Sequence, residues 1–407
     1  MNPNEIMKIL EETSYIRTSG TEQELRCARY IQDVVSSFGC TAELQPFPVP
    51  MAKIHAAELT VDGKRIACKG YLCAGNWEVE APFFYLRSMD PWAVSQCKGK
   101  IVLVDGYVGF WKYQDILESG AVGFISYNGN ASFPDKDIDQ RELRSYFHKG
   151  NRLPGVNIHV SDAIELIKMA PKTAKILLKQ EEWEGQSQNV ILDLPGESEE
   201  YIAFTAHYDS TSLSKGVYDN MSGCICLLSL AKYFSQHPHH RGMRFIWCGS
   251  EERGLLGSKY YCSDEERIRN CVLNINIDLF GCIMGKFLAC ASAEEKLCHY
   301  ISYLGSELGF SLESKQDIYS SDSTPFADHG VPAVSFSRVA PNNAATYHNR
   351  YDTIEVMSGQ QMAEDIEFVR CFAQRMDNAK HCPVSRVIPE NIREKLDVYL
   401  GRKRAKK

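Results

Sequence analysis

The chain has 407 residues, of which 44% are hydrophobic and 24% charged, and its formal net charge is −7. This composition is typical of a globular protein of one to three domains and argues against a disordered chain. The negative charge argues against a nucleic-acid partner. No apolar run reaches the roughly 18 residues of a membrane-spanning helix. We therefore expect a soluble protein that binds neither nucleic acid nor membrane.

The chain opens on an amphipathic segment that lacks the apolar core of a secretory signal. Its 15 cysteines include no C-x-x-C pair. Both features predict free, mostly buried thiols and a cytoplasmic location. The one basic run, "GRKRAKK" at residues 401–407, is predicted to be a solvated tail.

Strand-like and helix-like segments alternate in the second half of the chain. We predict strands at residues 189–194, 201–209, 243–250, 271–281 and 331–337, and helices at 222–236, 292–309 and 359–376. Two more helices are predicted at residues 4–16 and 21–39, the second with Thr21 as its cap and Glu24 three residues on. The alternation predicts an α/β fold with a mostly parallel mixed sheet flanked by helices.

The pattern changes between residues 41 and 185, where short strand-like segments are separated by turn residues. We therefore predict one α/β domain, made of residues 1–40 and 186–407, that is interrupted by a β-rich insert at residues 41–185.

Reactive side chains follow several of the predicted strands, at the point where each strand ends. These side chains are His207, Asp209, Glu251, Glu252 and Asp278. In addition, Asp219 begins a helix and His348 lies in a loop after the last strand. Because the carboxyl ends of parallel strands meet at one edge of a sheet, we expect all of these residues to converge.

Imidazole and carboxylate groups together suit Zn²⁺ or a similar divalent ion. The number of ligands predicts two ions. One ion would take His207 and Asp278, the other would take Glu252 and His348, and Asp219 would bridge them with its two oxygens. Two ions about 3.5–4 Å apart can hold both the attacking and the developing oxygen of a hydrolysis.

Supporting roles are predicted for the neighbours of these ligands. Glu251 lies next to a ligand but could face the water, so it is the candidate general base. Asp209 could accept the second N–H of His207, and Asp352 could do the same for His348. Tyr347 could donate its hydroxyl to an oxyanion. Each residue alone is more often a helix cap or a core group, and only their common position predicts a site.

The same stretches resemble peptidase family M28, the co-catalytic zinc aminopeptidases and their relatives. The matching motifs are "AHYDS", "GVYDNMSG", "SEERGLLGS", "NINIDLFG", "SDSTPF", "GVPAVSF" and "YHNRYDT", and the resemblance spans roughly residues 14–39 and 188–375. It implies zinc ligation by His207, Asp219, Glu252, Asp278 and His348. It also implies the roles given above to Glu251, Asp209 and Tyr347.

One position departs from the family. Ser323 follows Asp322, where the family often has histidine. That histidine is not a metal ligand, so the departure concerns the substrate pocket, and Asp322 itself could be structural or could face the substrate.

The insert resembles a protease-associated (PA) domain through "KGKIVLVDG", "YQDILESGAVGFISYNG" and "LPGVNIHVSDAIELIKMA". In such peptidases this domain is thought to act as a lid. The resemblance implies N-terminal helices of the catalytic domain at residues 1–40, a PA-like lid at 41–185 and the di-zinc peptidase domain at 186–407. A plain stabilising subdomain is the alternative.

The resemblance implies a metal-dependent hydrolase that removes N-terminal residues from peptides with a free α-amine. One alternative is a carboxypeptidase or dipeptidase of the same family; a carboxypeptidase would need a cation such as Arg338 or Arg350 for the terminal carboxylate. A second is a glutaminyl cyclase-like transferase, which usually works with one zinc. A third is a non-catalytic binding relative, which would typically have lost ligands. The sequence leaves the oligomeric state open.

Overall fold

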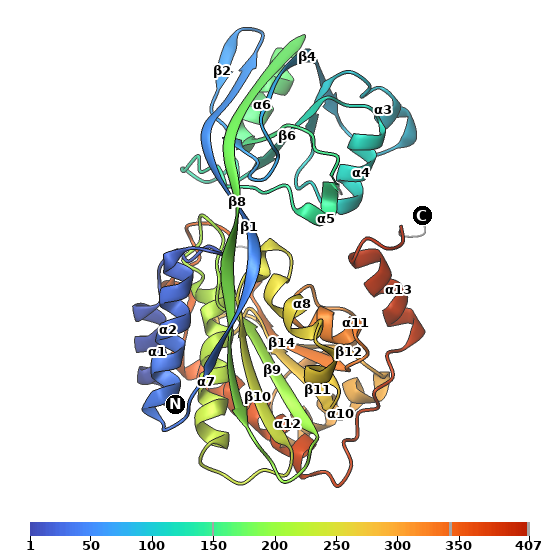
Figure 1. The fold of residues 1–407 in the computed structure, drawn as a ribbon. Helices are drawn as coiled ribbons and strands as arrows, with labels where there is room; N and C mark the ends of the chain where they lie inside the picture. The colour runs from blue at the N-terminus through green and yellow to red at the C-terminus, as the bar shows by residue number, and fades with distance from the viewer. Residues whose placement is uncertain (149, 342–343, 405–407) are drawn as a thin grey trace. The chain divides into compact units, whose positions relative to one another are not determined.

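The computed structural model describes residues 1–148, 150–341 and 344–404, and the chain divides into two compact units (Figure 1). Unit 1 consists of Met1–Val49 and Gln186–Lys407, and unit 2 consists of Pro50–Gly185. Two long strands, β1 (Glu43–Val61) and β8 (Thr173–Leu194), contribute residues to both units.

Unit 1 is built on an open mixed sheet with the strand order β13-β12-β14-β11-β9-β10-β8. Four neighbouring strands, β14, β11, β9 and β10, are parallel, whereas β8 and β12 run antiparallel to their neighbours in this group. The strands are β9 (Tyr201–His207), β10 (Gly242–Cys248), β11 (Cys271–Ile277), β12 (Lys286–Ser292), β13 (Glu313–Gln316) and β14 (Ala333–Val339). The predicted fold class is therefore confirmed.

Helices cover both faces of this sheet. The longer ones are α1 (Pro3–Glu12), α2 (Glu22–Ser37), α7 (Ser222–Phe234), α10 (Glu295–Leu308), α12 (Gly359–Asn378) and α13 (Glu390–Tyr399). The shorter elements are η1 (Val217–Met221), η2 (Glu251–Arg253), α8 (Leu256–Cys262), α9 (Glu265–Ile268), α11 (Ser323–Asp328) and η3 (Ile354–Val356). Strands β12 and β13 and helix α13 were not predicted from the sequence.

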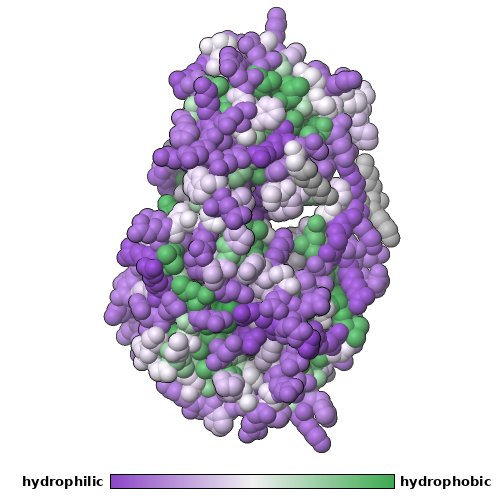
Figure 2. Space-filling view, in the orientation of Figure 1, coloured by the Kyte–Doolittle hydropathy of each residue, from purple (hydrophilic) through white to green (hydrophobic). Residues whose placement is uncertain are grey.

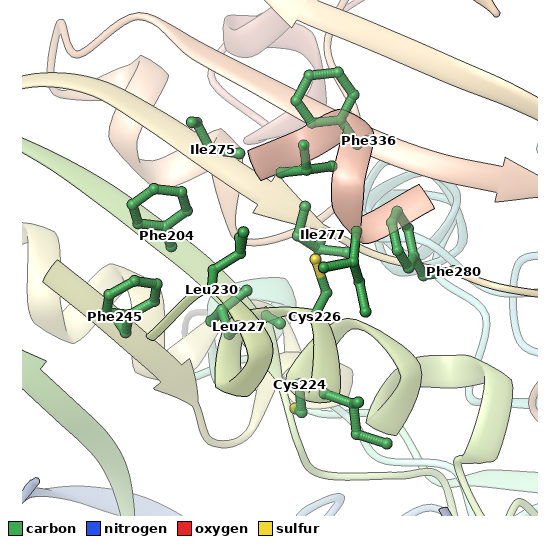
Figure 3. Packing of buried hydrophobic residues seen from close by; sticks show 14 of the residues in the cluster. Phe204, Cys224, Cys226, Leu227, Leu230, Phe245, Ile275, Ile277, Phe280 and Phe336 are labelled. Carbon is green, nitrogen blue, oxygen red and sulfur yellow. The ribbon is translucent and has the colours of Figure 1, made fainter. Parts of the chain in front are cut away.

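Successive residues of the central strands point to opposite faces and enter two separate cores. Phe204 and Phe245 lie in the larger core, where their rings stack with centroids 4.7 Å apart, whereas Ala203 and Ile246 lie in the smaller one. Helix α7 is buried along almost its whole length in the larger core. Figure 3 shows its Leu227 and Leu230 side chains beside these two phenylalanines. Burial of this helix fixes the segment that precedes it, which carries Asp219.

In unit 2 the strand order continues as β8-β4-β5-β6-β7-β3, and β1 pairs with β2 and β8 off this path. Strands β4, β5, β6 and β7 are parallel, whereas β8 and β3 are antiparallel to their neighbours in this group. The strands of this unit are β2 (Lys64–Ile66), β3 (Lys69–Gly70), β4 (Trp77–Leu86), β5 (Ile101–Val104), β6 (Gly123–Asn128) and β7 (Gly155–His159). Its helices are α3 (Pro91–Ser95), α4 (Phe110–Glu118), α5 (Ser145–His148) and α6 (Val160–Met169). Two hydrophobic clusters fill this unit, so it has a core independent of unit 1.

The face seen in Figure 2 is mainly hydrophilic, and its hydrophobic residues form separate small areas. All 15 cysteines are free, as predicted, and eleven of them are buried. Within the described residues, none of the helices combines the length and the apolar character needed to cross a bilayer. In the basic C-terminal run, Arg402 and Lys403 form ion pairs with Asp328 and Asp397, and residues 405–407 lie outside the described part.

Candidate metal centre

The register of the parallel strands brings three of the predicted site positions to one level of the sheet. His207 is the last residue of β9 and pairs with Cys248 at the end of β10, directly before the segment 249–252. On the other side of β9, Asn276 pairs with Thr205, so Asp278 follows β11 at the level of His207. All three strand ends therefore meet at the same edge, as expected for an α/β sheet.

The structure brings the five predicted ligands together in two groups of three that share Asp219. One group is His207, Asp219 and Asp278, the other is Asp219, Glu252 and His348, and the ligand atoms within each group lie within 4.8 Å of one another. Asp219 Oδ1 lies 3.0 Å from His207 Nε2, and Asp219 Oδ2 lies 3.0 Å from His348 Nε2. The two carboxylate oxygens of Asp219 thus face different imidazoles.

The remaining ligand distances are similar. His348 Nε2 lies 3.0 Å from Glu252 Oε1, and His207 Nε2 lies 3.7 Å from Asp278 Oδ1. The His207 side chain is 1% exposed, but that of His348 is 41% exposed. The centre is therefore buried on the sheet side and reaches solvent on the side of His348.

Negative charge dominates the electrostatics of the centre. Burial lowers the pKa of His207, but the charge of Glu251 and the nearby carboxylates of Asp209, Asp219 and Asp278 outweigh it and raise this pKa well above its ordinary value. The pKa of His348 is raised in the same way, chiefly by the charge of Glu252 against the effect of burial. Burial also raises the pKa of Glu251 well above its usual range. Buried carboxylates without enough positive charge favour a bound cation.

The segment that carries Asp219 is held from two sides. The side chain of Asn220 donates from Nδ2 to the carbonyl of Ile277 at 2.8 Å and accepts the N–H of Gly223 at 3.1 Å. It therefore ties the start of α7 to the strand that ends at Asp278. A Cβ on Gly223 would lie 2.5 Å from the carbonyl oxygen of Ile277, so only glycine permits this close approach.

Asp352 supports the same segment. The sequence suggested it as a partner for the His348 imidazole, but its hydrogen bonds among the described residues go elsewhere. Its carboxylate accepts hydrogen bonds from the Ser214 hydroxyl at 2.8 Å and from the N–H groups of Tyr218 and Asp219 at 2.7 and 3.3 Å. Burial and the charge of Asp219 raise the pKa of Asp352, and these hydrogen bonds oppose the rise. The net result is a pKa of about 6. Asp352 thus fixes the backbone of the candidate ligand Asp219.

Asp209 contacts the turn that carries Glu251 and Glu252. Its Oδ1 accepts the N–H of Glu251 at 2.9 Å, and its Oδ2 accepts the N–H of Glu252 at 3.2 Å. The Nδ1 atom of His207 lies 3.3 Å from the backbone carbonyl of Asp209 and 3.5 Å from its Oδ1. Asp209 therefore lies beside the imidazole and also holds the turn, which was not predicted.

Three site segments contain a non-glycine residue with a left-handed backbone. The residues are Ser250 (φ 59°), Leu279 (φ 57°) and His348 (φ 60°). Such a conformation costs about 1–3 kcal/mol and persists only where the surroundings enforce it. Each lies at a predicted ligand or within two residues of one. The contacts around the centre therefore hold the backbone in a conformation that it would not adopt alone.

Two other predicted positions are placed by their surroundings. The ring of Tyr347 lies edge-on to His348 with centroids 4.8 Å apart, and its side chain is among the exposed aromatic groups. Asp322 is fully buried, and burial raises its pKa to about 7. The neighbouring Ser323 hydroxyl forms a hydrogen bond with Ser335 across the core, so this position is packed within the domain.

Arg338 is engaged within the protein. Its guanidinium binds the buried carboxylate of Asp365 through Nε at 2.7 Å and Nη2 at 2.5 Å, and its Nη1 donates to the carbonyl of Gly285 at 2.7 Å. This bidentate pair leaves Arg338 poorly suited to a substrate carboxylate.

Two residues near the N-terminus contact the site segments although sequence reasoning gave them no role there. The buried guanidinium of Arg17 donates to backbone carbonyls on both sides of the loop after His207, including those of Tyr208 and Gly216. Glu24 reaches Ser250. Thr21 caps α2 as predicted, but the Glu24 carboxyl group accepts the N–H of Gly20 and not that of Thr21 itself. In the sequence, the buried position of Glu24 was indicated only by its place on the apolar face of that helix.

The donor set fits divalent ions such as Zn²⁺. In a tetrahedral site with ligand bonds of about 2.0–2.1 Å, neighbouring ligand atoms are separated by roughly 3.3 Å. The observed separations of 3.0 to 3.7 Å bracket this value. The buried Oδ1 of Asp278 has no hydrogen-bond partner among the described residues, as expected for an atom that would bind an ion.

The site consists of two carboxylate–imidazole groups at the carboxyl edge of an open α/β sheet. This arrangement is typical of a metallohydrolase. Comparison of the sequence specifies the class, because residues 189–370 match Peptidase family M28. Over this range the chain is similar to the M28 family, and the relatives that it matches are named aminopeptidases, so it is an M28-like enzyme. All five predicted ligands lie within the matched range.

Individual relatives agree with this assignment. The chain is 28% identical over 380 residues to Aminopeptidase YwaD of Bacillus subtilis, and the match covers 87% of this chain and 80% of that protein. It is 29% identical over 192 residues to Leucine aminopeptidase 2 of Trichophyton rubrum, but the match covers only 45% of this chain and 37% of that protein.

Solved structures share the fold. An aminopeptidase from Aneurinibacillus sp. strain AM-1 superposes with a TM-score of 0.76 at 23% identity and covers 94% of this chain and 96% of its own. A zinc aminopeptidase from Bacillus subtilis also gives a TM-score of 0.76, at 24% identity, and covers 95% of this chain and 99% of its own. The similarity extends over both units of the chain.

Proposed function

We propose that this protein is a metal-dependent aminopeptidase that removes N-terminal residues from peptides at a centre of two divalent ions, with zinc as the expected metal. The observation that carries the proposal is the sharing of Asp219 between two groups of three ligands. The relatives that are named aminopeptidases support the choice of reaction.

His207 and Asp278 would hold one ion, Glu252 and His348 would hold the other, and Asp219 would belong to both. Bound ions of this kind supply Lewis acidity for the scissile carbonyl and lower the pKa of a water. The protein's own part is to arrange the ligands and to exclude other geometries. Asn220, Asp352 and the burial of α7 perform that part for Asp219.

Glu251 is the proposed general base. It adjoins Glu252 in the turn whose N–H groups Asp209 holds, so its backbone is fixed while its side chain is the candidate to take a proton from the attacking water. The same carboxyl group would then give that proton to the leaving amine. Glu251→Gln should retain both ions and lose most of the turnover.

Tyr347 is the proposed oxyanion donor. Its ring contacts His348 and its side chain is exposed, so its hydroxyl is available to a bound substrate. Tyr347→Phe removes only the hydroxyl, and kcat should fall by about 100- to 1000-fold, the range for loss of one such donor. Unchanged turnover would remove Tyr347 from the mechanism.

The alternative of a carboxypeptidase is disfavoured by a specific contact. Such an enzyme needs a cation for the terminal carboxylate of its substrate, and one of the two arginines considered, Arg338, is paired bidentately with Asp365. A glutaminyl cyclase-like transferase would use one ion, whereas the ligand groups number two. A dipeptidase remains compatible with the same centre and is distinguished by the length of the substrate.

The test is a panel of amino-acid anilides, N-acetylated anilides, dipeptides and longer peptides, with metal content measured on the same preparation. We expect two ions per chain and hydrolysis only where the α-amine is free. Hydrolysis restricted to N-blocked substrates would contradict the proposal, and hydrolysis restricted to dipeptides would favour the dipeptidase. Asp219→Asn provides the matched variant, and Asp33→Asn, at an exposed position of α2, provides the control.

We also propose that unit 2 is a PA-like subdomain that restricts the size of the substrate. Its support is the sequence resemblance together with its independent core, which indicates a separate folding unit. Replacement of residues 50–185 by a short Gly-Ser linker should change the ratio of rates for long and short peptides more than it changes metal content. Equal loss of both would identify the unit as a stabilising element only.

A further inference from the structure

Glu24 lies in the first turn of helix α2, but its carboxyl group is directed into the protein. Glu24 as a whole is 1% exposed. Oε2 accepts the N–H of Gly20 at 2.6 Å, and Oε1 accepts the hydroxyl of Ser187 at 2.9 Å and the N–H of Ser250 at 3.2 Å. One side chain thus joins the N-terminal segment, strand β8 and the segment after β10.

The contact with Ser250 concerns the turn that carries Glu251 and Glu252. Three consecutive N–H groups of this turn, at residues 250–252, point at buried carboxyl groups, since Glu24 accepts the first and Asp209 accepts the other two. The Ser250 hydroxyl also forms a 2.5 Å hydrogen bond with Ser19. Ser250 has a left-handed backbone, and these contacts offset the cost of that conformation.

The residue before this turn packs directly against Glu24. A Cβ on Gly249 would lie 2.5 Å from the carbonyl oxygen of Gln188, 2.7 Å from Ser187 Oγ and 3.1 Å from Glu24 Oε1. There is no room for a side chain or a water between them. A shift of the Glu24 carboxyl group would therefore displace the turn through direct contact.

We propose that Glu24 is a positioning residue for the hydrolysis, which holds the 250–252 turn together with Asp209 and so fixes Glu251 and Glu252. This inference rests on the proposed function for the roles of those two glutamates. A role for Glu24 that is confined to the folding of α2 would predict a general loss of stability. A positioning role predicts a local effect on the turn and on kcat.

Glu24→Met tests this, because methionine has a similar length but no acceptor oxygen. We expect kcat to fall by about 10- to 100-fold, the range observed for groups that orient metal ligands, with KM within about twofold of the wild-type value. We expect faster amide hydrogen exchange at residues 249–252 of the metal-free protein, with unchanged exchange in unit 2. Glu24→Gln keeps an acceptor for Ser250 and should restore most of both properties.

Glu22→Gln is the matched control, since Glu22 lies in the same helical turn but is exposed. If Glu24→Met does not fold, Glu24→Asp takes its place, because it withdraws the acceptors by one methylene, and the same changes in kcat and exchange are expected. A kcat within twofold of wild type, unchanged exchange at 249–252, or a glutamine variant as impaired as the methionine variant would overturn the proposal. If the wild-type protein hydrolyses no peptide, the proposed function fails, while the exchange measurement still decides whether Glu24 holds the turn.

Discussion

Asp209 Oδ1 accepts the backbone N–H of Glu251 at 2.9 Å, although 42 positions separate the two residues. The carboxylate also lies 3.5 Å from His207 Nδ1, so it connects the candidate ligand at the end of β9 with the proposed base after β10. This hydrogen bond makes the geometry of the base depend on a residue that would touch neither substrate nor metal.

Asp209→Asn should lower kcat by about 10- to 100-fold. Asparagine can accept only one of the two N–H groups that Asp209 Oδ1 and Oδ2 accept, and its amide would place a donor against the other. Steady-state kinetics on an amino-acid anilide measures the effect. Full activity in Asp209→Asn would show that the turn does not depend on this carboxylate.

Gly223→Ala should disturb the Asp219 segment. The added methyl group would meet the Ile277 carbonyl at 2.5 Å and the Asn220 side chain at 2.6 Å. We expect a loss of about 1–3 kcal/mol in the free energy of unfolding and weaker metal binding. Ser229→Ala, on the same helix, is the control, because the buried Ser229 hydroxyl has no hydrogen-bond partner in the described structure, and it should leave both properties unchanged or slightly improved. Equal effects of the two variants would contradict this account.

Asp365→Ala should destabilise the protein strongly without changing substrate choice. It would leave the buried guanidinium of Arg338 without its carboxylate, which costs about 3–5 kcal/mol. Glu313→Ala, which breaks the exposed pair with Lys286, should cost no more than about 1 kcal/mol. Urea unfolding measures both. Loss of activity towards substrates with a free C-terminus, at unchanged stability, would instead give Arg338 a binding role.

The pH dependence of stability should contain a contribution from Glu24. Burial, together with the charge of Asp209, raises its pKa to about 8, against an ordinary value of 4.5. The folded protein therefore binds one proton more than the unfolded chain between these two values, and its free energy of unfolding should fall as the pH rises from about 4.5 to 8. In metal-free Glu24→Gln this component should be absent. An identical pH slope in variant and wild type would refute it.

Much of the fold could be predicted because the central strands and helix α7 are buried and nearly continuously apolar. Strand β12 and the edge strand β13 escaped prediction, since "KFLACAS" carries no clear period and "ESKQ" is short. The convergence of the five candidate ligands could be predicted because they lie at strand ends, at a helix start and in the loop after the last strand, and the structure places these residues together.

The supporting contacts could not be predicted, because they depend on pairs far apart in the chain. Glu24 has the spacing of a capping residue, and only the packing of α2 against the sheet directs it to Ser250, 226 positions away. Asp352 has the spacing of a partner for His348, yet in the folded chain it accepts the backbone N–H groups of Tyr218 and Asp219. Such choices are decided by tertiary geometry, which local spacing does not encode.

The central claim is that Asp219 belongs to two ion sites at once. Anomalous X-ray diffraction at the zinc absorption edge, on crystals of the zinc-loaded protein, tests it most directly. The account predicts two peaks, one among His207, Asp219 and Asp278 and one among Asp219, Glu252 and His348. A single peak, or peaks that Asp219 does not contact, would contradict it.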